Sequence, residues 1–376
     1  MTKEINLITI AEQFTSQGQV TGIESLGNGN INDTLLVTLD SSEKKHFVLQ
    51  RINTQVFRQP ELVMQNMQIL TDHVCDSYAA LSANRDRLQS TAPNRRWEVP
   101  RLLLTQNSQN LWIDQNNGYW RAMSFVENAE SFDTLPDSSH ASEIGYALGM
   151  FHNLISDLPP DKLADTLPGF HITPVYLQHY EDILSKTHPY ISPEVSYCLQ
   201  FVNAHTTLAN ILEDAKATGK LPLRLMHGDP KINNVLFDTT THKAVSIIDL
   251  DTVKPGLVHY DIGDCLRSGC NPVGEETEEW EKVYFDADLC QGILQGYLDV
   301  AQAFLTENDY SYIYAAIRLI TFELGLRFFT DYLAGNLYFK IKYPEHNLAR
   351  ALVQFKLTES IESQETKIRQ IIADLR

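Results

Sequence analysis

Hydrophobic and polar residues alternate along the first third of the chain, with the two-residue period of half-buried β-strands. The alternation predicts strands at 20–26, 34–39, 46–53, 99–104, 111–114 and 120–125. Residues 60–82 instead follow a helical pattern that begins at Pro60, and proline is favoured in the first turn of a helix. We therefore predict a β-rich first third that contains one long helix.

The hydrophobic period becomes helical at about Asp137, and Ile144, Leu148 and Phe151 then share one helical face. Further helices are predicted at 174–187, 192–216, 281–305, 308–335 and 358–375. Between the two patterns, the strand at 120–125 gives way to an acidic, loop-like segment. We therefore predict two domains, residues 1–126 and residues 127–376.

The helix predicted at 308–335 is apolar on nearly every side, which is typical of a buried helix. Glu323, Arg327 and Asp331 nevertheless recur along one face at four-residue spacing. Buried charges are costly unless they are paired or used. The three residues are therefore either a ladder of internal ion pairs or the polar wall of a substrate cleft, where Tyr338 would add a further contact.

Composition narrows the class of protein. The chain has 376 residues, of which 43% are hydrophobic and 21% charged, as in soluble globular proteins of two ordinary lobes. Its net charge of −18 argues against nucleic acid or an anionic membrane as the main partner, because both require basic surface. The five cysteines form no CxxC pair, and the N-terminus lacks the apolar core of a signal peptide. We therefore expect a cytoplasmic protein.

Candidate chemistry is concentrated in the stretch from His227 to Asn234 and in a buried strand that ends at Asp249. Asp229 lies in the loop and is suited to accept or orient the hydroxyl group of a substrate. Asn234 and Asp249 offer the oxygen ligands that Mg²⁺ prefers. The pattern therefore indicates phosphoryl transfer with a metal ion, with Asp229 as the catalytic candidate that orients the attacking hydroxyl and Asn234 and Asp249 as metal ligands.

Three further polar residues accompany this stretch. Lys231 would either neutralise phosphate charge or be a solvated loop lysine. Asp261 is expected to hold the loop after residues 256–258 by hydrogen bonds. His152, beside an apolar helical face, is expected to be a hydrogen-bonded core residue rather than a ligand.

Gly27 and Gly29 lie in a glycine- and asparagine-rich segment between the first two predicted strands. Glycines let the backbone approach a ligand closely and expose N–H donors. Asn-Gly is also the strongest hairpin dipeptide, so a plain hairpin turn is the alternative. In a phosphate-binding protein the same hairpin would cover the nucleotide.

The third predicted strand should carry a cation for the phosphates, but it contains no lysine. It offers Arg51, or Gln50 in the alternative register. Glu61 is either the acidic partner of this cation or an exposed residue that stabilises the first turn of its helix. Backbone groups near Glu127, where the strand at 120–125 leaves the first domain, could pair with the adenine ring.

The ordered set of motifs resembles the aminoglycoside phosphotransferase and choline kinase superfamily. The resemblance is carried by His227-Gly228-Asp229…Asn234, Ile248-Asp249 and Gly256…Tyr260-Asp261. Within that superfamily the chain looks like the N-acetylhexosamine 1-kinase branch. That closer likeness is carried by residues 27–34, 47–53, 328–333 and 338–340.

This resemblance implies an α+β, two-lobed, protein-kinase-like fold with a small antiparallel β N-lobe and a larger, mainly helical C-lobe. It also implies ATP-dependent phosphorylation of the anomeric hydroxyl of N-acetylglucosamine or N-acetylgalactosamine, with Mg²⁺. Asn30, Arg327 and Tyr338 would contact the sugar beside Asp229. Asn30 stands where that branch is expected to have a histidine.

Two alternative functions use the same residues. The first keeps the phosphotransferase chemistry but has an aminoglycoside, choline or another small alcohol as acceptor. Arg327 would repel a polycation, so the mixed charges of its helix suit a neutral sugar better. The second is a catalytically silent nucleotide-binding regulator, for which only the missing strand lysine argues.

Overall fold

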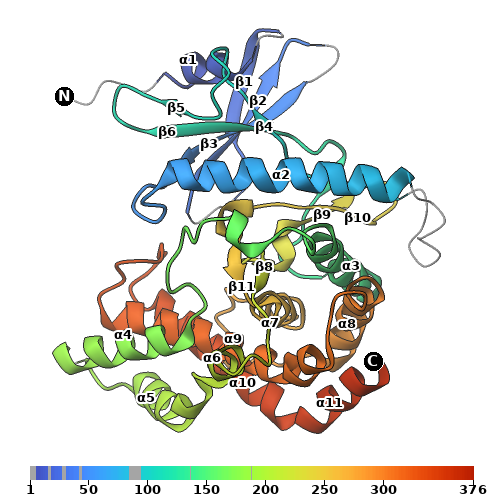
Figure 1. Ribbon diagram of the computed structural model, residues 1–376. Helices are drawn as coiled ribbons and strands as arrows, with labels where there is room; N and C mark the ends of the chain where they lie inside the picture. The colour runs from blue at the N-terminus through green and yellow to red at the C-terminus, as the bar shows by residue number, and fades with distance from the viewer. Residues whose placement is uncertain are drawn as a thin grey trace.

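The structure has two parts, a β-sheet and a larger group of helices, with the long helix α2 lying between them (Figure 1). The computed structural model describes residues 6–15, 18–27, 31–41, 45–83, 95–135, 137–187 and 189–376, apart from the side chains of residues 80–83. The predicted α+β architecture of an antiparallel sheet followed by a helical part is confirmed. None of the helices within these ranges is both long enough and apolar enough to cross a membrane.

The N-terminal sheet is antiparallel throughout. Its strands are β1 (Val20–Ser25), β2 (Asp33–Leu39), β3 (His46–Ile52), β4 (Leu102–Leu103), β5 (Trp112–Ile113) and β6 (Tyr119–Ser124). They follow the order β1-β2-β3-β6-β4, and β5 also pairs with β6. Each predicted strand is present, although β4 is shorter than the predicted 99–104.

Strand register sorts the side chains of this sheet onto two faces. Leu49 of β3 and Ala122 of β6 are paired and lie in a buried cluster with Ile10 of α1 (Leu7–Ala11). Because side chains alternate along a strand, the next pair, Gln50 and Arg121, points to the other face, toward α2 (Pro60–Ala83). The register therefore decides which polar groups of the sheet face the helical part.

The C-terminal part consists mainly of helices packed around α7 and α9 (Figure 1). The helices are α3 (Ser138–Leu154), α4 (Thr173–Lys186), α5 (Pro193–His205), α6 (Ile211–Ala217), α7 (Val258–Gly269), α8 (Ala287–Ala301), α9 (Glu307–Leu333), α10 (His346–Ser363) and α11 (Glu365–Asp374). Gly263 lets α7 approach the backbone of α9, because a Cβ atom there would meet the Ala316 carbonyl oxygen at 2.7 Å.

Three predicted helices differ from the observed ones. The predicted helix 192–216 is broken into α5 and α6, and 358–375 contains the break between α10 and α11 at Gln364. The helix predicted at 281–305 begins only at Ala287. Helix α7 was not predicted, because its buried polar residues Asp261 and Asp264 make the segment resemble a loop.

Short strands hold the loops that carry the candidate chemistry. β8 (Arg224–Met226) pairs with β11 (Lys254–Gly256), and β9 (Val235–Asp238) pairs with β10 (Ala244–Ile247) and β7 (Ala129–Glu130). The loop containing Asp229 runs from β8 to β9, and Asp249 follows β10. The predicted domain boundary after residue 126 falls between β6 and β7 and stays a prediction.

Candidate active site

The loop that carries Asp229 is held by hydrogen bonds to Asp261 of α7. The backbone N–H groups of His227 and Gly228 donate to its two carboxylate oxygens at 2.6 and 2.8 Å. Gly228 has a φ of +89°, and a Cβ atom there would lie 2.8 Å from the Thr252 carbonyl oxygen. The loop therefore requires glycine at this position. Asp261 fixes the backbone immediately before Asp229.

Asp261 consequently has a different role from the predicted one, since it holds the loop that carries Asp229 rather than the loop after residues 256–258. His152 completes the arrangement, with Nε2 at 2.8 Å from Asp261 Oδ2 and Nδ1 at 3.0 Å from the hydroxyl of Tyr297. His152 is buried, so its predicted role as a hydrogen-bonded core residue is confirmed. Buried polar groups that are all satisfied make a rigid support.

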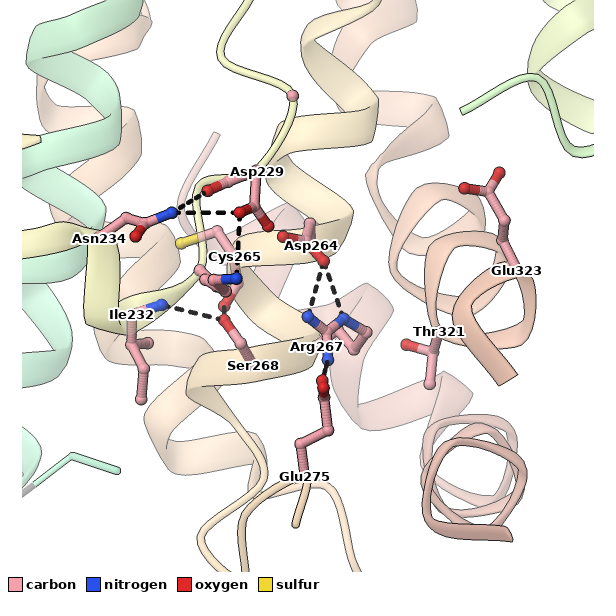
Figure 2. A network of polar contacts seen from close by, with 12 residues as sticks. Asp229, Ile232, Asn234, Asp264, Cys265, Arg267, Ser268, Glu275, Thr321 and Glu323 are labelled. Atoms are coloured by element: carbon pink, nitrogen blue, oxygen red, sulfur yellow. Dashed lines mark hydrogen bonds and ion pairs between the residues drawn. The ribbon is translucent and has the colours of Figure 1, made fainter. Parts of the chain in front are cut away.

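Asp229 and Asn234 come together in this loop (Figure 2), and Lys231 contacts the same carboxylate. The Asn234 amide nitrogen donates to the main-chain oxygen of Asp229 at 2.7 Å and to its carboxylate at 3.3 Å. Lys231 Nζ lies 3.1 Å from Asp229 Oδ2. The Asp229 carboxylate raises the pKa of Lys231, and the ion pair keeps the ammonium group of this lysine beside Asp229.

Asp249 follows β10 in a left-handed backbone conformation, with φ 66° and ψ 54°, which is uncommon for a residue other than glycine. Its side chain reaches solvent, although many protein atoms surround it. Desolvation by these atoms, together with the nearby charges of Asp251 and Asp229, raises the pKa of Asp249 to about 7. Such repulsion between carboxylates would be relieved by a divalent cation.

The donor atoms fit a magnesium ion. The Asn234 amide nitrogen donates a hydrogen bond to Asp229, so the Asn234 amide oxygen can face a metal ion. Asp249 supplies a carboxylate. Within the described residues, no group of three or more His, Cys, Asp or Glu side chains could hold a metal ion alone. A magnesium ion would therefore need phosphate oxygens and water as well, which is its usual coordination in phosphoryl transfer.

Helix α7 supports the 3-10 turn Ile232–Asn234 through Ser268, and a buried ion-pair network of the same helix lies beside this contact (Figure 2). Arg267 of α7 donates to Asp264 at 2.8 Å and to Glu275 at 2.7 Å. Beside it on the same helix, the hydroxyl of Ser268 accepts from the backbone N–H of Ile232 at 3.3 Å. No sequence pattern pointed to this support, because α7 was not predicted.

The structure does not bring Arg51 to the site. Its side chain lies on the outer face of the sheet, close to the Asp114 carboxylate and Gly118. Gln50 points to the inner face instead, where its amide oxygen accepts from the guanidinium of Arg121 at 3.0 and 2.6 Å. Arg121 is the functional candidate that sequence reasoning missed.

Glu61 is exposed in the first turn of α2, which agrees with one of its two interpretations. Gly27 has a φ of +69°, and a Cβ atom there would project into open space. Gly29 and Asn30 lie outside the described residues. Glu127 binds His46 through its carboxylate at 2.8 Å, and its carbonyl oxygen accepts from Arg96 at 2.6 Å. A role for Gly27 or Glu127 in nucleotide binding stays a prediction.

The charges along α9 do not form a ladder of ion pairs. Glu323 contacts His171 at 2.9 Å and accepts from the Thr173 hydroxyl at 2.6 Å. The other His171 nitrogen lies 2.7 Å from the Gly228 carbonyl oxygen. Burial lowers the pKa of His171, but the Glu323 carboxylate outweighs this effect, and the pKa lies above its ordinary value. Glu323 therefore supports the catalytic loop through His171.

Arg327, one turn further along α9, lies among aromatic rings. Its guanidinium carbon is 5.3 Å from the ring centre of Phe170, 5.0 Å from that of Tyr176 and 5.6 Å from that of Phe339. These distances are those of cation–π contacts. Burial lowers the pKa of Arg327, but Tyr176, Tyr338, Glu323 and Asp229 together outweigh it, and the pKa lies above its ordinary value.

Asp331 shapes the loop that carries Tyr338. Its carboxylate accepts from the backbone N–H groups of Leu337, Tyr338 and Phe339 at 2.8, 2.8 and 2.9 Å. The Asn347 amide adds a fourth bond at 2.9 Å. Asp331 is therefore a structural residue that positions the loop of Tyr338, and its carboxylate accepts four hydrogen bonds from the protein.

Arg327 and Tyr338 line one cleft of about 780 Å³. Its walls come from the segment after β3, from residues 165–170, and from α4, α9 and the loop after α9. Its other lining residues are Gln55, Val56, Arg58, Gln59, Asp165, Thr166, Leu167, Pro168, Phe170, Tyr176, His179, Ile183, Thr330, Asp331, Ala334, Leu337 and Phe339. The structure thus brings together two of the three predicted sugar contacts.

A two-lobed fold of this kind, with a carboxylate in the loop after β8 and a second one after β10, defines a kinase-like phosphotransferase. The chain belongs to the phosphotransferase enzyme family, whose model matches residues 22–299. It is accordingly a phosphotransferase with a kinase-like fold.

Solved structures share this fold. An aminoglycoside phosphotransferase from Alicyclobacillus acidocaldarius is 15% identical, with a TM-score of 0.59 over 100% of this chain and 98% of that one. A microcompartment-associated aminopropanol kinase is 17% identical, with a TM-score of 0.60 over 96% and 98%. A choline kinase from Cryptosporidium parvum is 14% identical, with a TM-score of 0.58 over 97% and 96%. At such identities the likeness establishes the fold alone.

Proposed function

We propose that this protein transfers the γ-phosphoryl group of ATP to the anomeric hydroxyl of an N-acetylhexosamine, such as N-acetylglucosamine or N-acetylgalactosamine. The single observation that carries the choice of acceptor is the state of the charges in the cleft that Arg327 and Tyr338 line. Its carboxylates already have partners, and its aromatic rings already surround a cation.

The carboxylates of the cleft offer little to a cationic acceptor. Asp331 accepts three backbone N–H groups and one side-chain amide. Asp165, at the opposite wall, lies 2.6 Å from the buried ammonium group of Lys254. An aminoglycoside with several ammonium groups would need unpaired carboxylates, because each buried charge requires a partner. A neutral acceptor needs none.

The aromatic residues argue against a quaternary ammonium acceptor for the same reason. Phe170, Tyr176 and Phe339 could form the aromatic cage that recognises choline-like cations. Arg327 lies within cation–π distance of all three rings. A second cation there would be repelled. The guanidinium is instead suited to donate hydrogen bonds to the carbonyl and hydroxyl oxygens of a neutral sugar.

The proposed transfer needs no reactant other than ATP and the sugar. The anomeric oxygen attacks the γ-phosphorus in line, and its bond to phosphorus forms as the bond from phosphorus to the β,γ-bridging oxygen breaks. The hydroxyl proton passes to the Asp229 carboxylate, and ADP leaves with the electron pair of the broken bond. Lys231, held 3.1 Å from Asp229, neutralises charge beside the transferred group.

Magnesium belongs to the same proposal. Asn234 and Asp249 would hold it, and the ion would neutralise negative charge on the phosphates of the nucleotide. The chain itself orients the reactants, because Asp261 fixes the loop of Asp229 and Asn234 ties the end of that loop to its beginning.

A coupled ADP-release assay with Mg-ATP tests the acceptor. The panel contains N-acetylglucosamine, N-acetylgalactosamine, glucose, an aminoglycoside, choline and an amino alcohol. We expect turnover with the N-acetylhexosamines and none with their 1-O-methyl glycosides, in which the attacking hydroxyl is blocked.

Turnover with the blocked glycosides would move the phosphoryl group to another hydroxyl. Turnover with choline or the aminoglycoside, but with no sugar, would replace the proposed acceptor. Binding of ATP without turnover of any acceptor would favour the alternative that the protein is a catalytically silent, nucleotide-binding regulator.

A further inference from the structure

The third strand of the sheet lacks a lysine, yet a buried cation lies on the inner face next to it. Arg121 of β6 is directly opposite Gln50 of β3, and its side chain is only 1% exposed. Gln50 accepts two hydrogen bonds from the guanidinium, at 3.0 and 2.6 Å. The position on β3 that faces the helical part is thus neutral, and it orients a cation from the neighbouring strand.

The ion-pair partner of this cation comes from the C-terminal part of the chain rather than from α2. Toward α2, the guanidinium contacts the Met67 sulfur at 3.8 Å. Its ion-pair partner is Asp251, which lies in the 3-10 turn Leu250–Thr252 that follows Asp249. Arg121 and Asp251 therefore join the sheet to the turn that carries the proposed metal ligand.

Asp251 is also held by the loop that enters β2. The Asn32 amide donates to Asp251 Oδ2 at 2.6 Å, and the Asn32 amide oxygen accepts from the backbone N–H of Asn53 at 3.0 Å. Asn32 is 8% exposed and lies just beyond the glycine-rich segment. One ion pair, from Arg121, and one hydrogen bond, from Asn32, thus converge on one carboxylate from two segments of the sheet.

The same turn is tied to the catalytic loop on its other side. The Thr252 hydroxyl donates to the carbonyl oxygen of His227 at 2.7 Å, and the Thr252 carbonyl is the group that requires glycine at position 228. The turn Leu250–Thr252 is therefore fixed between the catalytic loop and the N-terminal sheet. Asp249 immediately precedes it in a strained backbone conformation.

We propose that Arg121 is a positioning residue that stands in for the missing strand lysine. Gln50 holds Arg121, and Arg121 and Asn32 together clamp Asp251. The clamp orients Asp249, two residues earlier, toward a nucleotide-bound magnesium ion. The proposal rests on the proposed use of Mg-ATP but not on the identity of the acceptor. It explains why β3 can carry glutamine where a phosphate-binding cation was expected. It also gives Asn32 a means to couple the segment before β2 to the metal ligand.

A buried ion pair alone would not imply this role, because such pairs contribute little net stability and can be structural. Here the pair joins β3, β6, the loop before β2 and the metal-binding turn. Breaking it would release the turn without touching Asp229 or Asn234. The expected defect is therefore in Mg-ATP binding rather than in acceptor binding.

The test measures Mg-ATP binding by calorimetry in the absence of acceptor, on the full-length chain. The variants are Arg121→Met, Arg121→Lys and the double variant Gln50→Lys/Arg121→Met, which moves the cation to the opposite position on β3. Arg51→Met, on the outer face of the same strand, is the matched comparison. Circular dichroism and urea unfolding establish that each variant is folded.

We expect Arg121→Met to weaken Mg-ATP binding and to raise the Mg²⁺ concentration needed for it, each by about tenfold or more. Arg121→Lys should lose less, and the double variant should regain part of the affinity, whereas Arg51→Met should bind as the wild type does. If Arg121→Met cannot be purified folded, Asn32→Ala and Asp251→Asn provide the same measurement from the other side of the clamp.

Unchanged Mg-ATP affinity in a folded Arg121→Met variant would overturn the proposal. So would a larger loss for Arg51→Met than for Arg121→Met, since it would return the role to β3. Because acceptor is absent, failure of every sugar in the ADP-release assay leaves this test intact. A wild-type protein that binds no Mg-ATP would overturn this proposal and the proposed function together.

Discussion

Asp229 is the residue on which the proposed chemistry depends most directly. Its carboxylate is 29% exposed and contacts Lys231 and Asn234, so these neighbours set both its charge and its position. An amide at this position would keep the shape and one hydrogen-bond acceptor but could not take a proton. Replacing Asp229 with asparagine should therefore remove the proposed base and leave the fold intact.

Asp229→Asn is expected to lower kcat by about 10²- to 10⁴-fold, the usual contribution of a general base. Mg-ATP affinity should change little, because Asn234 and Asp249 remain. Single-turnover kinetics and calorimetry measure the two quantities. Asp299→Asn, on the exposed face of α8, is the matched control. A kcat for Asp229→Asn close to the control would remove Asp229 from its role.

Arg327 is, at the same scale, the residue that we propose excludes cationic acceptors from the cleft. Replacing it with methionine should raise the KM for the sugar about tenfold, which corresponds to about 1.4 kcal/mol, because its hydrogen bonds to the sugar are lost. The three aromatic rings would then be free to receive an external cation, so choline should become a competitive inhibitor. Steady-state kinetics with and without choline measure both effects.

Arg318→Met is the control for this variant, since Arg318 lies on the same helix but faces Glu362 at 3.7 Å instead of the cleft. The KM for ATP should stay near the wild-type value in both variants. If choline inhibits the wild type as strongly as Arg327→Met, the guanidinium does not exclude cations and the preference for a neutral acceptor loses its support.

At the scale of elements, α9 supports the catalytic loop through a buried pair. His171 and Glu323 are both buried, and the pKa of His171 lies above its ordinary value. A raised folded-state pKa means that the folded protein binds the proton more tightly than the unfolded chain. This stabilisation is fully present below about pH 6.5, the unfolded value, and is lost as the pH rises through the folded value.

The double variant His171→Asn/Glu323→Gln removes both titrating groups. The difference in unfolding free energy between the wild type and this variant should be most favourable to the wild type near pH 6 and shrink toward about pH 9. Urea denaturation across that range measures the difference, with His242→Asn as an exposed control. A difference that stays constant with pH would show that the pair does not titrate in this way.

Elements also show how far hydrophobic patterning can be used. Strands β1, β2, β3 and β6 were predicted nearly to their ends, because one side of each strand faces a core and the other does not. Helix α7 escaped prediction, since Asp261, Asp264 and Arg267 are buried and paired with one another or with backbone groups. A polar residue carries no signal in sequence that distinguishes solvent from a buried partner.

At the scale of the whole molecule, the site is assembled between the two parts of the chain. The sheet contributes Arg121 and Asn32, the turn after β10 contributes Asp251, and α9 contributes Arg327 on the acceptor side. Each proposed role depends on at least one contact between segments far apart in sequence. The kinase-like architecture therefore acts as the frame that brings a nucleotide side and an acceptor side to one carboxylate.

The sequence by itself determined the reaction class, the loop of Asp229 with Asn234 and Asp249, and the α+β order of the elements. These features are local, because a motif and a hydrophobic period are complete within a few neighbouring residues. The tertiary structure decided that Gln50 and Arg121, not Arg51, face the helical part, and that Asp261 holds the catalytic loop. It also decided that Arg327 stands among aromatic rings rather than in an ion-pair ladder. Those outcomes depend on strand register and on helix packing, which join residues that no sequence spacing connects.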